Sequence, residues 1–293
     1  MLSLHTNAAA MNIQKAIGNT SSNLKTTMTR LGTGLRINSA KDDAAGLQIA
    51  VRLKAQTQGM QMAMQNTQNA SSMLQTAGGA MQEVTNILYR MKDLATQAAD
   101  GSSSDEDKKA MQAEYDALGK ELSNIMSNTA YGGVKLLTKG DEKGAGGGKL
   151  TQEVTFQIGA SKDETMKVDF SENLKLTQDQ FGKLSAVYST QTATTGAELT
   201  TKANEMIDLI NEAIDGVGGL RSAIGAAENR LDHTHQNLEN MATSTTDAHG
   251  RIMDADMASE SAKMSSQQVL MQAGMAMLKQ SNSMNQMILS LVQ

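Results

Sequence analysis

Apolar residues recur in three stretches of the chain, with spacings that alternate between four and three. These stretches span residues 70–98, 111–125 and 199–241. In the longest stretch, twelve of the thirteen positions with this spacing are apolar. A period of 3.5 residues over this length predicts helices that pack as coiled coils. The thirteen positions are Leu199, Ala203, Met206, Ile210, Ala213, Val217, Leu220, Ile224, Ala227, Leu231, Thr234, Leu238 and Met241.

The two ends of the chain have a helical pattern and almost no charge. Residues 1–29 carry only Lys15 and Lys25, and residues 264–293 carry only Lys279. Such helices need tertiary packing for stability, so we expect both ends to be buried against each other and against neighbouring copies. The heptad positions of the C-terminal end are Leu270, Ala273, Met277, Gln280, Met284, Met287 and Leu291.

Polar residues indicate two helix starts, and glycines indicate a weak point. Segment 39–42 (Ser-Ala-Lys-Asp) reads as a variant of the capping box before an apolar run. Segment 103–106 (Ser-Ser-Asp-Glu) opens a helix predicted over 104–129. Three glycines within 216–219 interrupt the longest stretch. Each costs roughly 1 kcal/mol relative to Ala in a helix, so we expect a locally weak or bent segment there.

The hydrophobic period changes between residues 130 and 198. Apolar and polar residues alternate at 154–158 and again at 166–170, with the turn-rich segment 159–164 between them. This pattern predicts a β-hairpin, and the Gly-rich segment 140–149 before it reads as a flexible linker. The whole pattern predicts a mainly α fold, with long coiled-coil-like helices from both chain ends packed together and a small β-hairpin region.

The composition narrows the fold class and excludes several functions. The 293 residues include 22 Met, three Phe, four Tyr and no Trp, so small and flexible side chains must fill thin seams between helices. Cys is absent, which removes disulfides and thiol chemistry. The net charge is −5, so we expect no nucleic-acid partner. No run of about 18 apolar residues is present, so we expect no membrane partner.

Three short motifs could carry chemistry, and each fits a plainer interpretation better. The Gly-rich segment 144–149 lacks the spacing and the Ser/Thr of a phosphate-binding loop. His233 and His235 stand two residues apart on a predicted helix, so they do not share a face. Asp254 and Asp256 lack the further oxygen ligands of a calcium loop. We therefore expect no catalytic site, no metal site and no cofactor, and we do not expect an enzyme.

Four longer motifs are specific enough to indicate a family. Residues 35–50 read LRINSAKDDAAGLQIA and residues 251–258 read RIMDADMA. Residues 268–274 read QVLMQAG and residues 289–292 read LSLV. The first motif resembles the N-terminal signature of bacterial flagellin, and the other three resemble its C-terminal signature.

The resemblance covers residues 1–137 and about 197–293, and it implies a subunit of the flagellar filament. Because the segment between these blocks is short, the chain resembles a short type of flagellin with a minimal variable region. The implied domains are an inner tube from residues 1–38 and 255–293, a helical rod from residues 39–139 and 197–254, and a short outer hairpin segment from residues 140–196.

The implied function is structural: self-assembly into the bacterial flagellar filament for motility. The implied partners are further copies of the chain, the flagellar export chaperone, the cap protein and the hook-associated junction proteins. Flagellins are extracellular and leave the cell through the flagellar type III export channel, which agrees with the lack of a signal-peptide pattern at residues 1–5. We expect residues 1 to about 35 and 255–293 to be disordered in the monomer and helical in the filament. A hook-associated or cap protein of the same appendage is the alternative.

The positions of two arginines predict a junction between the chain ends. At about 1.5 Å per helical residue, antiparallel terminal helices would bring Arg36 and Arg251 close together. We expect one of them to form an ion pair there, although these charges could equally serve only to cap helices. The candidate carboxylates are Asp42, Asp43, Asp254 and Asp256. The candidate residues for the buried contacts of the polymer are Leu270, Met277, Met284 and Leu291.

One helical segment resembles a receptor-binding site. Residues 88–97 (LYRMKDLATQ) are similar to the segment that Toll-like receptor 5 binds in many flagellins, which implies this receptor as a partner. The heptad places Leu88 and Met91 in the seam and so turns Arg90 outward. The alternative is that Arg90 serves packing between subunits alone. The candidate residues are Tyr89, Arg90, Leu94 and Glu114, and Tyr89 stands where a Gln is common in the family.

Overall fold

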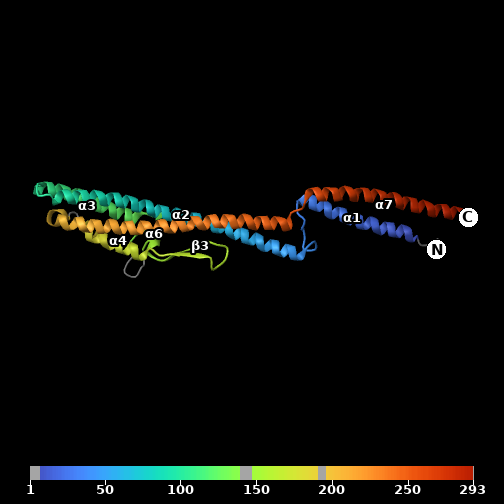
Figure 1. The fold of residues 1–293 in the computed structure, drawn as a ribbon, viewed down its shortest axis with the longest axis horizontal. Helices are drawn as coiled ribbons and strands as arrows, with labels where there is room; N and C mark the ends of the chain where they lie inside the picture. The colour runs from blue at the N-terminus through green and yellow to red at the C-terminus, as the bar shows by residue number, and fades with distance from the viewer. Residues whose placement is uncertain (1–6, 139–146, 191–195, 293) are drawn as a thin grey trace. The chain divides into compact units, whose positions relative to one another are not determined.

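The computed structural model describes residues 7–138, 147–190 and 196–292 (Figure 1). The chain forms two compact units. The terminal unit contains residues 1–57 and 243–293, and the central unit contains residues 58–242. For residues 189, 190, 285, 286 and 288–292, the structure describes the backbone but not the side chains. The predicted division into an inner tube, a rod and an outer segment stays a prediction.

The described residues are mainly helical, with two small antiparallel sheets. This confirms the predicted fold class. Residues 140–146 of the predicted Gly-rich linker, and the whole N-terminal segment 1–5, lie outside the described residues. The elements in chain order are α1 (Ala8–Thr33), α2 (Ala44–Ala99), α3 (Asp105–Asn128), β1 (Ala130–Tyr131), β2 (Val134–Lys135), the 3-10 helix η1 (Lys149–Thr151), β3 (Val154–Gln157), β4 (Thr165–Val168), α4 (Ser171–Leu184), α5 (Ala186–Thr190), α6 (Glu198–Met253) and α7 (Met257–Val292).

The predicted seams form the core of the central unit. Every heptad position of α2 from Ala70 to Ala98 is buried. Most heptad positions of α6 are buried as well and belong to the same hydrophobic cluster. Helices α3 and α4 add Tyr115 and Phe181 to this cluster, and neither side chain is exposed. The core is therefore a set of seams among several helices rather than a two-stranded coiled coil.

The backbone of α6 stays helical at its glycines, so no break lies there, and a locally weak segment at 216–219 stays a prediction. In α6, which lies wholly within the described residues, the residue with non-helical backbone angles is Lys202 (φ −142°, ψ 34°). The glycines at 216–219 lie beside Val217 and Leu220, which are 0% and 1% exposed. Tertiary packing of these neighbours outweighs the low helix propensity of glycine.

The seam of α6 also changes phase near the end of the predicted stretch. Met241 is 41% exposed, whereas Ala242 is 8% exposed. The seam therefore steps by four residues from Leu238 rather than by three. A straight α-helix has 3.6 residues per turn, so a strict repeat of 3.5 drifts around it, and the longer step brings the seam back toward the core.

Side chains cap α3 and α2 in different ways. The Ser104 hydroxyl accepts from the Asp107 amide at 3.2 Å, and the Asp107 carboxylate accepts from the Ser104 amide at 3.1 Å. This capping box confirms the predicted start of α3. The capping box predicted at 39–42 is wrong, because that segment forms a loop. The Asp43 carboxylate caps α2 by accepting from the Gly46 amide at 2.8 Å.

Strands β3 and β4 form the predicted hairpin. They pair antiparallel, with Val154 opposite Val168 and Phe156 opposite Met166. Val154, Met166 and Val168 are buried in the central core. The alternation of apolar residues therefore predicted the hairpin, and the structure supplies its register and its buried face.

The β1–β2 hairpin, η1 and α4 of the central unit were not predicted. The β1–β2 hairpin has only two residues per strand, too few to show alternation, and it turns at Gly132 and Gly133 with φ of 58° and 82°. Helix α4 follows the β3–β4 hairpin directly, and η1 precedes it. A β-carbon at Gly148, next to η1, would overlap the main-chain carbonyl of Leu136.

A buried polar network holds the start of α6 against α3. Gln112 is 2% exposed. Its amide nitrogen donates to Asp116 Oδ1 at 2.8 Å and to Glu198 Oε2 at 2.7 Å, and its oxygen accepts from the Leu199 amide at 2.7 Å. The other oxygen of Asp116 accepts from the Gly196 amide at 2.9 Å. Because buried polar groups need partners, this network ties two segments that are far apart in the sequence.

In the terminal unit, α1 packs along α7 (Figure 1). Leu24 and Thr27 of α1 are buried. The two helices approach closely at Gly274, where a β-carbon would lie 2.9 Å from Cγ1 of Ile17. Helix α1 ends at Gly34, which adopts the left-handed conformation (φ 73°) that favours glycine. This cap turns the chain into the loop that leads to α2.

Candidate functional site

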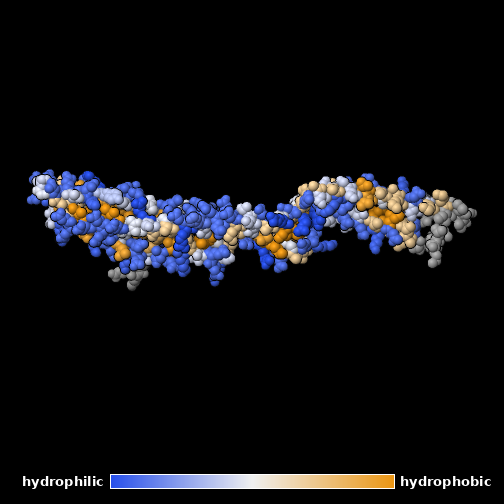
Figure 2. Space-filling model, viewed as in Figure 1, coloured by the Kyte–Doolittle hydropathy of each residue, from blue (hydrophilic) through white to orange (hydrophobic). Residues whose placement is uncertain are grey.

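Helix α7 has an apolar stripe that the single chain leaves exposed. Leu270, Met277 and Met284 are seven residues apart in turn, so they lie on one face of the helix. They are 57%, 61% and 52% exposed, and Figure 2 shows apolar surface over α1 and α7. The side chain of Leu291, the fourth predicted member, lies outside the described side chains. Exposed apolar patches on a monomer mark interaction sites.

A different face of α7 packs against α1. Met271, Gly274 and Leu278 are half-buried, whereas Ala273 and Met277 are exposed. The heptad positions predicted from the sequence therefore do not form the seam with α1, and this expectation needs correction. The two faces differ because a shift of one residue rotates a helix by about 100°. A helix that is apolar on more than one face is normally buried in a larger assembly.

The seam between α1 and α7 is incompletely filled. A shallow cavity of about 510 Å³ lies along it. The buried Oε1 atom of Gln267 has no hydrogen-bond partner among the described residues. The seam between the two helices is therefore polar at this point and leaves space beside Gln267. The cavity is lined by Thr20, Asn23, Ser259, Ala262, Lys263, Ser266, Gln267 and Leu270.

Main-chain hydrogen bonds join the loop after α1 to the chain between α6 and α7. The Arg36 amide donates to the Met253 carbonyl at 2.6 Å, and the Ala255 amide donates to the Gly34 carbonyl at 2.9 Å. Leu35 forms an isolated antiparallel bridge in the same place. The two segments therefore pair like a very short sheet, which we call the junction (residues 34–38 and 250–256).

The ion pairs expected at the junction are not formed. The Arg36 guanidinium instead donates through Nε and Nη2 to the Ile252 carbonyl, at 3.2 and 2.8 Å. That carbonyl lies in the last turn of α6, where main-chain acceptors lack partners within the helix. Arg251 is exposed. Within the described residues, no ion pair joins either arginine to any of the four candidate aspartates.

The aspartates serve as caps and loop anchors instead. Asp42 accepts from the amides of Ser39 and Asn38 at 2.9 and 3.1 Å. These hydrogen bonds, that of Ser39 first, hold the pKa of Asp42 below its usual value. Asp256 caps α7 by accepting from the Ala258 amide at 3.0 Å. Asp254 is exposed, and its backbone forms the bridge to Leu35. This agrees with the alternative that these charges cap helices.

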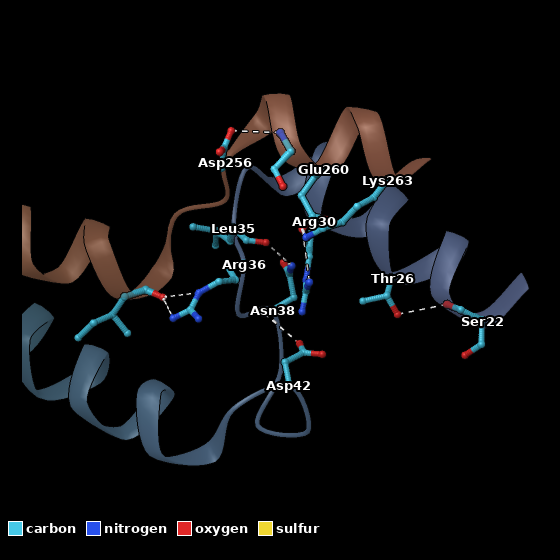
Figure 3. A network of polar contacts seen from close by, with 12 residues as sticks. Ser22, Thr26, Arg30, Leu35, Arg36, Asn38, Asp42, Asp256, Glu260 and Lys263 are labelled. Carbon is cyan, nitrogen blue, oxygen red and sulfur yellow. Dashed lines mark hydrogen bonds and ion pairs between the residues drawn. The ribbon is translucent and has the colours of Figure 1, made fainter. Parts of the chain in front are cut away.

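A buried acid beside the junction was missed by the sequence analysis. Glu260 is 5% exposed, and its Oε1 lies 2.8 Å from Lys263 Nζ and 3.6 Å from Arg30 Nη1. The hydrogen bond from Lys263, followed by the charges of Lys263 and Arg30, lowers the pKa of Glu260. The spacing of Glu260 and Lys263 is a helical pairing signal, but the contact with Arg30 depends on the tertiary structure (Figure 3).

On the central unit, the structure brings three of the four predicted receptor residues to the surface. Arg90 Nη2 lies 2.6 Å from Glu114 Oε1, and the two side chains are 54% and 46% exposed. Tyr89 is 53% exposed. Leu94 is 3% exposed and lies in the core, so its selection as a surface residue was wrong. The apolar stripe of α2 is wider than a heptad seam because Leu94 and Ala95 are both buried.

Two further observations concern cofactors and membranes. Across the described ranges, no group of three or more His, Cys, Asp or Glu side chains is placed to hold a metal ion. Among the helices that the structure describes, none is long and apolar enough to cross a membrane.

Comparison with known proteins identifies the family. Residues 4–141 match the bacterial flagellin N-terminal helical region, and residues 207–292 match the bacterial flagellin C-terminal helical region. The helical fold, with both chain ends paired in one unit, suits this class of structural protein. The chain belongs to the bacterial flagellin family.

Individual relatives agree with this assignment. Flagellin B of Vibrio anguillarum is 42% identical over 182 residues, which are 62% of this chain and 46% of that protein. B-type flagellin of Pseudomonas aeruginosa is 45% identical over 167 residues, which are 57% of this chain and 32% of that protein. The alignments thus span less than half the length of these two relatives. A solved structure from Vibrio parahaemolyticus, assigned as a flagellar hook-associated protein, is similar in fold, with a TM-score of 0.58, 17% identity, and coverage of 73% of this chain and 100% of that chain.

Proposed function

We propose that this chain is a structural subunit that self-assembles into the extracellular bacterial flagellar filament and so serves motility. Membership of the flagellin family supports a structural rather than a catalytic role. The observation that supports self-assembly most directly is the exposed stripe of Leu270, Met277 and Met284 on α7. Its occupant is a second copy of the chain, because the termini of every copy carry the same low charge and apolar helices.

The magnitude of this burial is large enough to drive polymerisation. Full burial of a Met or Leu side chain contributes about 1.5–3 kcal/mol. Since Met277 is 61% exposed, about 1–2 kcal/mol of that contribution is still available to an intermolecular contact. Repeated over the stripe and over several neighbours, such contacts outweigh the roughly 2–5 kcal/mol that coupled folding and binding costs in ordering.

Seeded polymerisation tests this proposal. Purified chain is added to filament fragments, the pellet is measured by sedimentation, and the product is imaged in negative stain. We expect filaments, and we expect Met277→Gln to raise the critical concentration roughly 5- to 30-fold, since about 1.4 kcal/mol is a factor of ten. Met277→Leu is the matched control, because it keeps the apolar volume. A chain that forms no filaments at any concentration rules out the proposal.

The same experiment separates the alternative function. A hook-associated or cap protein would add only a terminal structure and would not elongate the seeds. The fold similarity to the hook-associated protein supports a shared architecture alone, because the sequence identity is 17%. The matches to both flagellin regions favour the filament subunit.

The transition of the terminal helices between monomer and polymer is part of this proposal. We infer that residues 1 to about 35 and 255–293, which contain α1 and α7, are disordered in the monomer and become helical in the filament, because their apolar faces need neighbours. The export chaperone, the cap protein and the hook-associated junction proteins are the further partners, and export proceeds without a cleaved signal peptide. Hydrogen exchange of monomer and polymer tests the transition: protected amides in α1 and α7 of the free monomer would contradict it.

The junction is proposed to hold the terminal helices in the register that assembly needs. Its support is the pair of hydrogen bonds from Arg36 to the Ile252 carbonyl. We expect Arg36→Ala to slow polymerisation and Arg251→Ala, a matched control without that contact, to polymerise normally. Equal polymerisation of both variants would remove Arg36 from this role.

We also propose that the free chain binds Toll-like receptor 5 through Arg90, Glu114 and Tyr89. The support is the resemblance of residues 88–97 and the exposed Arg90–Glu114 pair. Such an exposed pair contributes only ~0–1 kcal/mol to folding, so Arg90 is available as an interface anchor. Binding of the receptor ectodomain is measured for the wild type, Arg90→Ala and the control Arg230→Ala. Weaker binding of Arg90→Ala alone is expected, and equal affinities would reject the site.

A further inference from the structure

The described methionines range from fully buried to largely exposed. Those of the central core, such as Met81, Met91 and Met206, are 0%, 1% and 4% exposed. Those on the apolar stripe of α7, Met277 and Met284, are 61% and 52% exposed. The chain has 22 Met and no Cys, so its thioethers are its sulfur groups that can be oxidised. Methionine oxidation follows exposure, so the two groups must differ in reactivity.

The chemistry needs only a peroxide as the oxidant. A lone pair of the Met277 or Met284 sulfur attacks one peroxide oxygen, and the O–O bond breaks. The sulfur gains one oxygen and loses two electrons, and the remaining oxygen leaves as water after proton transfer. The product, methionine sulfoxide, is polar, and methionine sulfoxide reductases convert it back to the thioether.

We propose that Met277 and Met284 form a reversible oxidation site that controls whether an unassembled chain can polymerise. This inference rests on the proposed self-assembly through the α7 stripe. Burial of a sulfoxide between two copies without a hydrogen-bond partner is unfavourable, because buried polar groups need partners. An oxidised subunit is therefore excluded from the growing polymer, whereas a subunit already assembled has the same sulfurs covered and is protected.

The position of the two sulfurs makes the effect specific to assembly. Met277 and Met284 do not lie on the face of α7 that packs against α1, where Met271, Gly274 and Leu278 are half-buried. Oxidation at this site therefore leaves the face of α7 that packs against α1 chemically unchanged. The central core keeps its thioethers, because peroxide does not reach them.

The test uses the full chain, hydrogen peroxide and peptide mass spectrometry. Brief peroxide treatment should add one oxygen to Met277 and Met284 before Met81, Met91 and Met206 react. The treated chain should show a critical concentration raised about tenfold or more per sulfoxide pair, and incubation with methionine sulfoxide reductases should restore assembly. Treated filaments should carry much less sulfoxide at both positions.

A double variant separates this site from the other exposed methionines. Met277→Leu/Met284→Leu keeps the stripe apolar and cannot be oxidised there, so it should polymerise equally well before and after peroxide. Inhibition of this variant to the wild-type extent would overturn the inference, as would normal assembly of a wild-type chain with both sulfoxides present. If the untreated wild type does not polymerise, the proposed function fails first, and the inference fails with it.

Discussion

Replacement of Gln112 by Leu should strongly destabilise the central unit. The substitution keeps a side chain of similar size but removes three hydrogen bonds at a site that is 2% exposed. Two of these bonds end on carboxylates and are each worth about 1.5–3 kcal/mol. The third leaves the Leu199 amide without its acceptor, at about 1–3 kcal/mol.

These contributions do not add fully, because the three groups form one network. Asp116 keeps the Gly196 amide as a partner, and Glu198 keeps the Ala186 amide at 2.8 Å. We therefore expect a loss of about 3–4 kcal/mol in the free energy of unfolding, less than the sum of the three terms. The start of α6 should also become mobile, since Gln112 ties Leu199 to α3.

Urea unfolding followed by circular dichroism measures the loss, and hydrogen exchange at the Leu199 amide reports it locally. The matched control is Gln75→Leu on the exposed side of α2, for which a change within about 0.5 kcal/mol is expected. A loss below about 1 kcal/mol for Gln112→Leu, or unchanged exchange at Leu199, would refute the reasoning from the network.

Three further predictions concern single groups. Tyr115→Phe should cost about 1–2 kcal/mol in urea unfolding, because the Tyr115 hydroxyl donates to the Leu184 carbonyl at 3.0 Å; an unchanged midpoint would contradict this. Gly148→Ala should cost about 2–3 kcal/mol in thermal unfolding, since its β-carbon would overlap the Leu136 carbonyl, and a stabilised variant would contradict the close approach. The lowered pKa of Glu260 means that its stabilisation is complete above about pH 5 and is lost as the pH falls through the folded-state pKa. Helicity of the polymerised chain, in which the terminal helices are proposed to be ordered, should fall more steeply from pH 6 to pH 3 in the wild type than in Glu260→Gln, and parallel curves would reject this role.

The sequence alone determined the features that depend on neighbours close in the chain. The heptad positions from Ala70 to Ala98 are all buried, because the side chains of a helix repeat their direction every few residues. The β3–β4 hairpin followed from alternation of apolar residues in the same way, although its register did not. The capping box at Ser104 was also predictable, since its partners are three residues apart. The family signatures in residues 35–50 and 251–258 are likewise continuous motifs.

Contacts between distant segments were decided only by the tertiary structure. Leu94 is buried because the width of the α2 stripe depends on how many helices pack against it. Arg36 binds the Ile252 carbonyl rather than a carboxylate, because the loop after α1 meets the last turn of α6. The contact between Gln112 and Glu198 could not be predicted from the sequence, because a hydrogen bond between residues 86 positions apart produces no local pattern.

The two apolar faces of α7 combine both kinds of information. The sequence showed that Leu270, Met277 and Met284 share one face, because residues seven apart on a helix point the same way. It did not show that the seam with α1 uses the neighbouring face, at Gly274 and Leu278. Which face of an apolar helix meets its partner depends on the shape and close approach of that partner, such as Ile17 of α1 against Gly274. Local periodicity therefore identifies which residues share a face of a helix, and tertiary packing decides which face remains exposed.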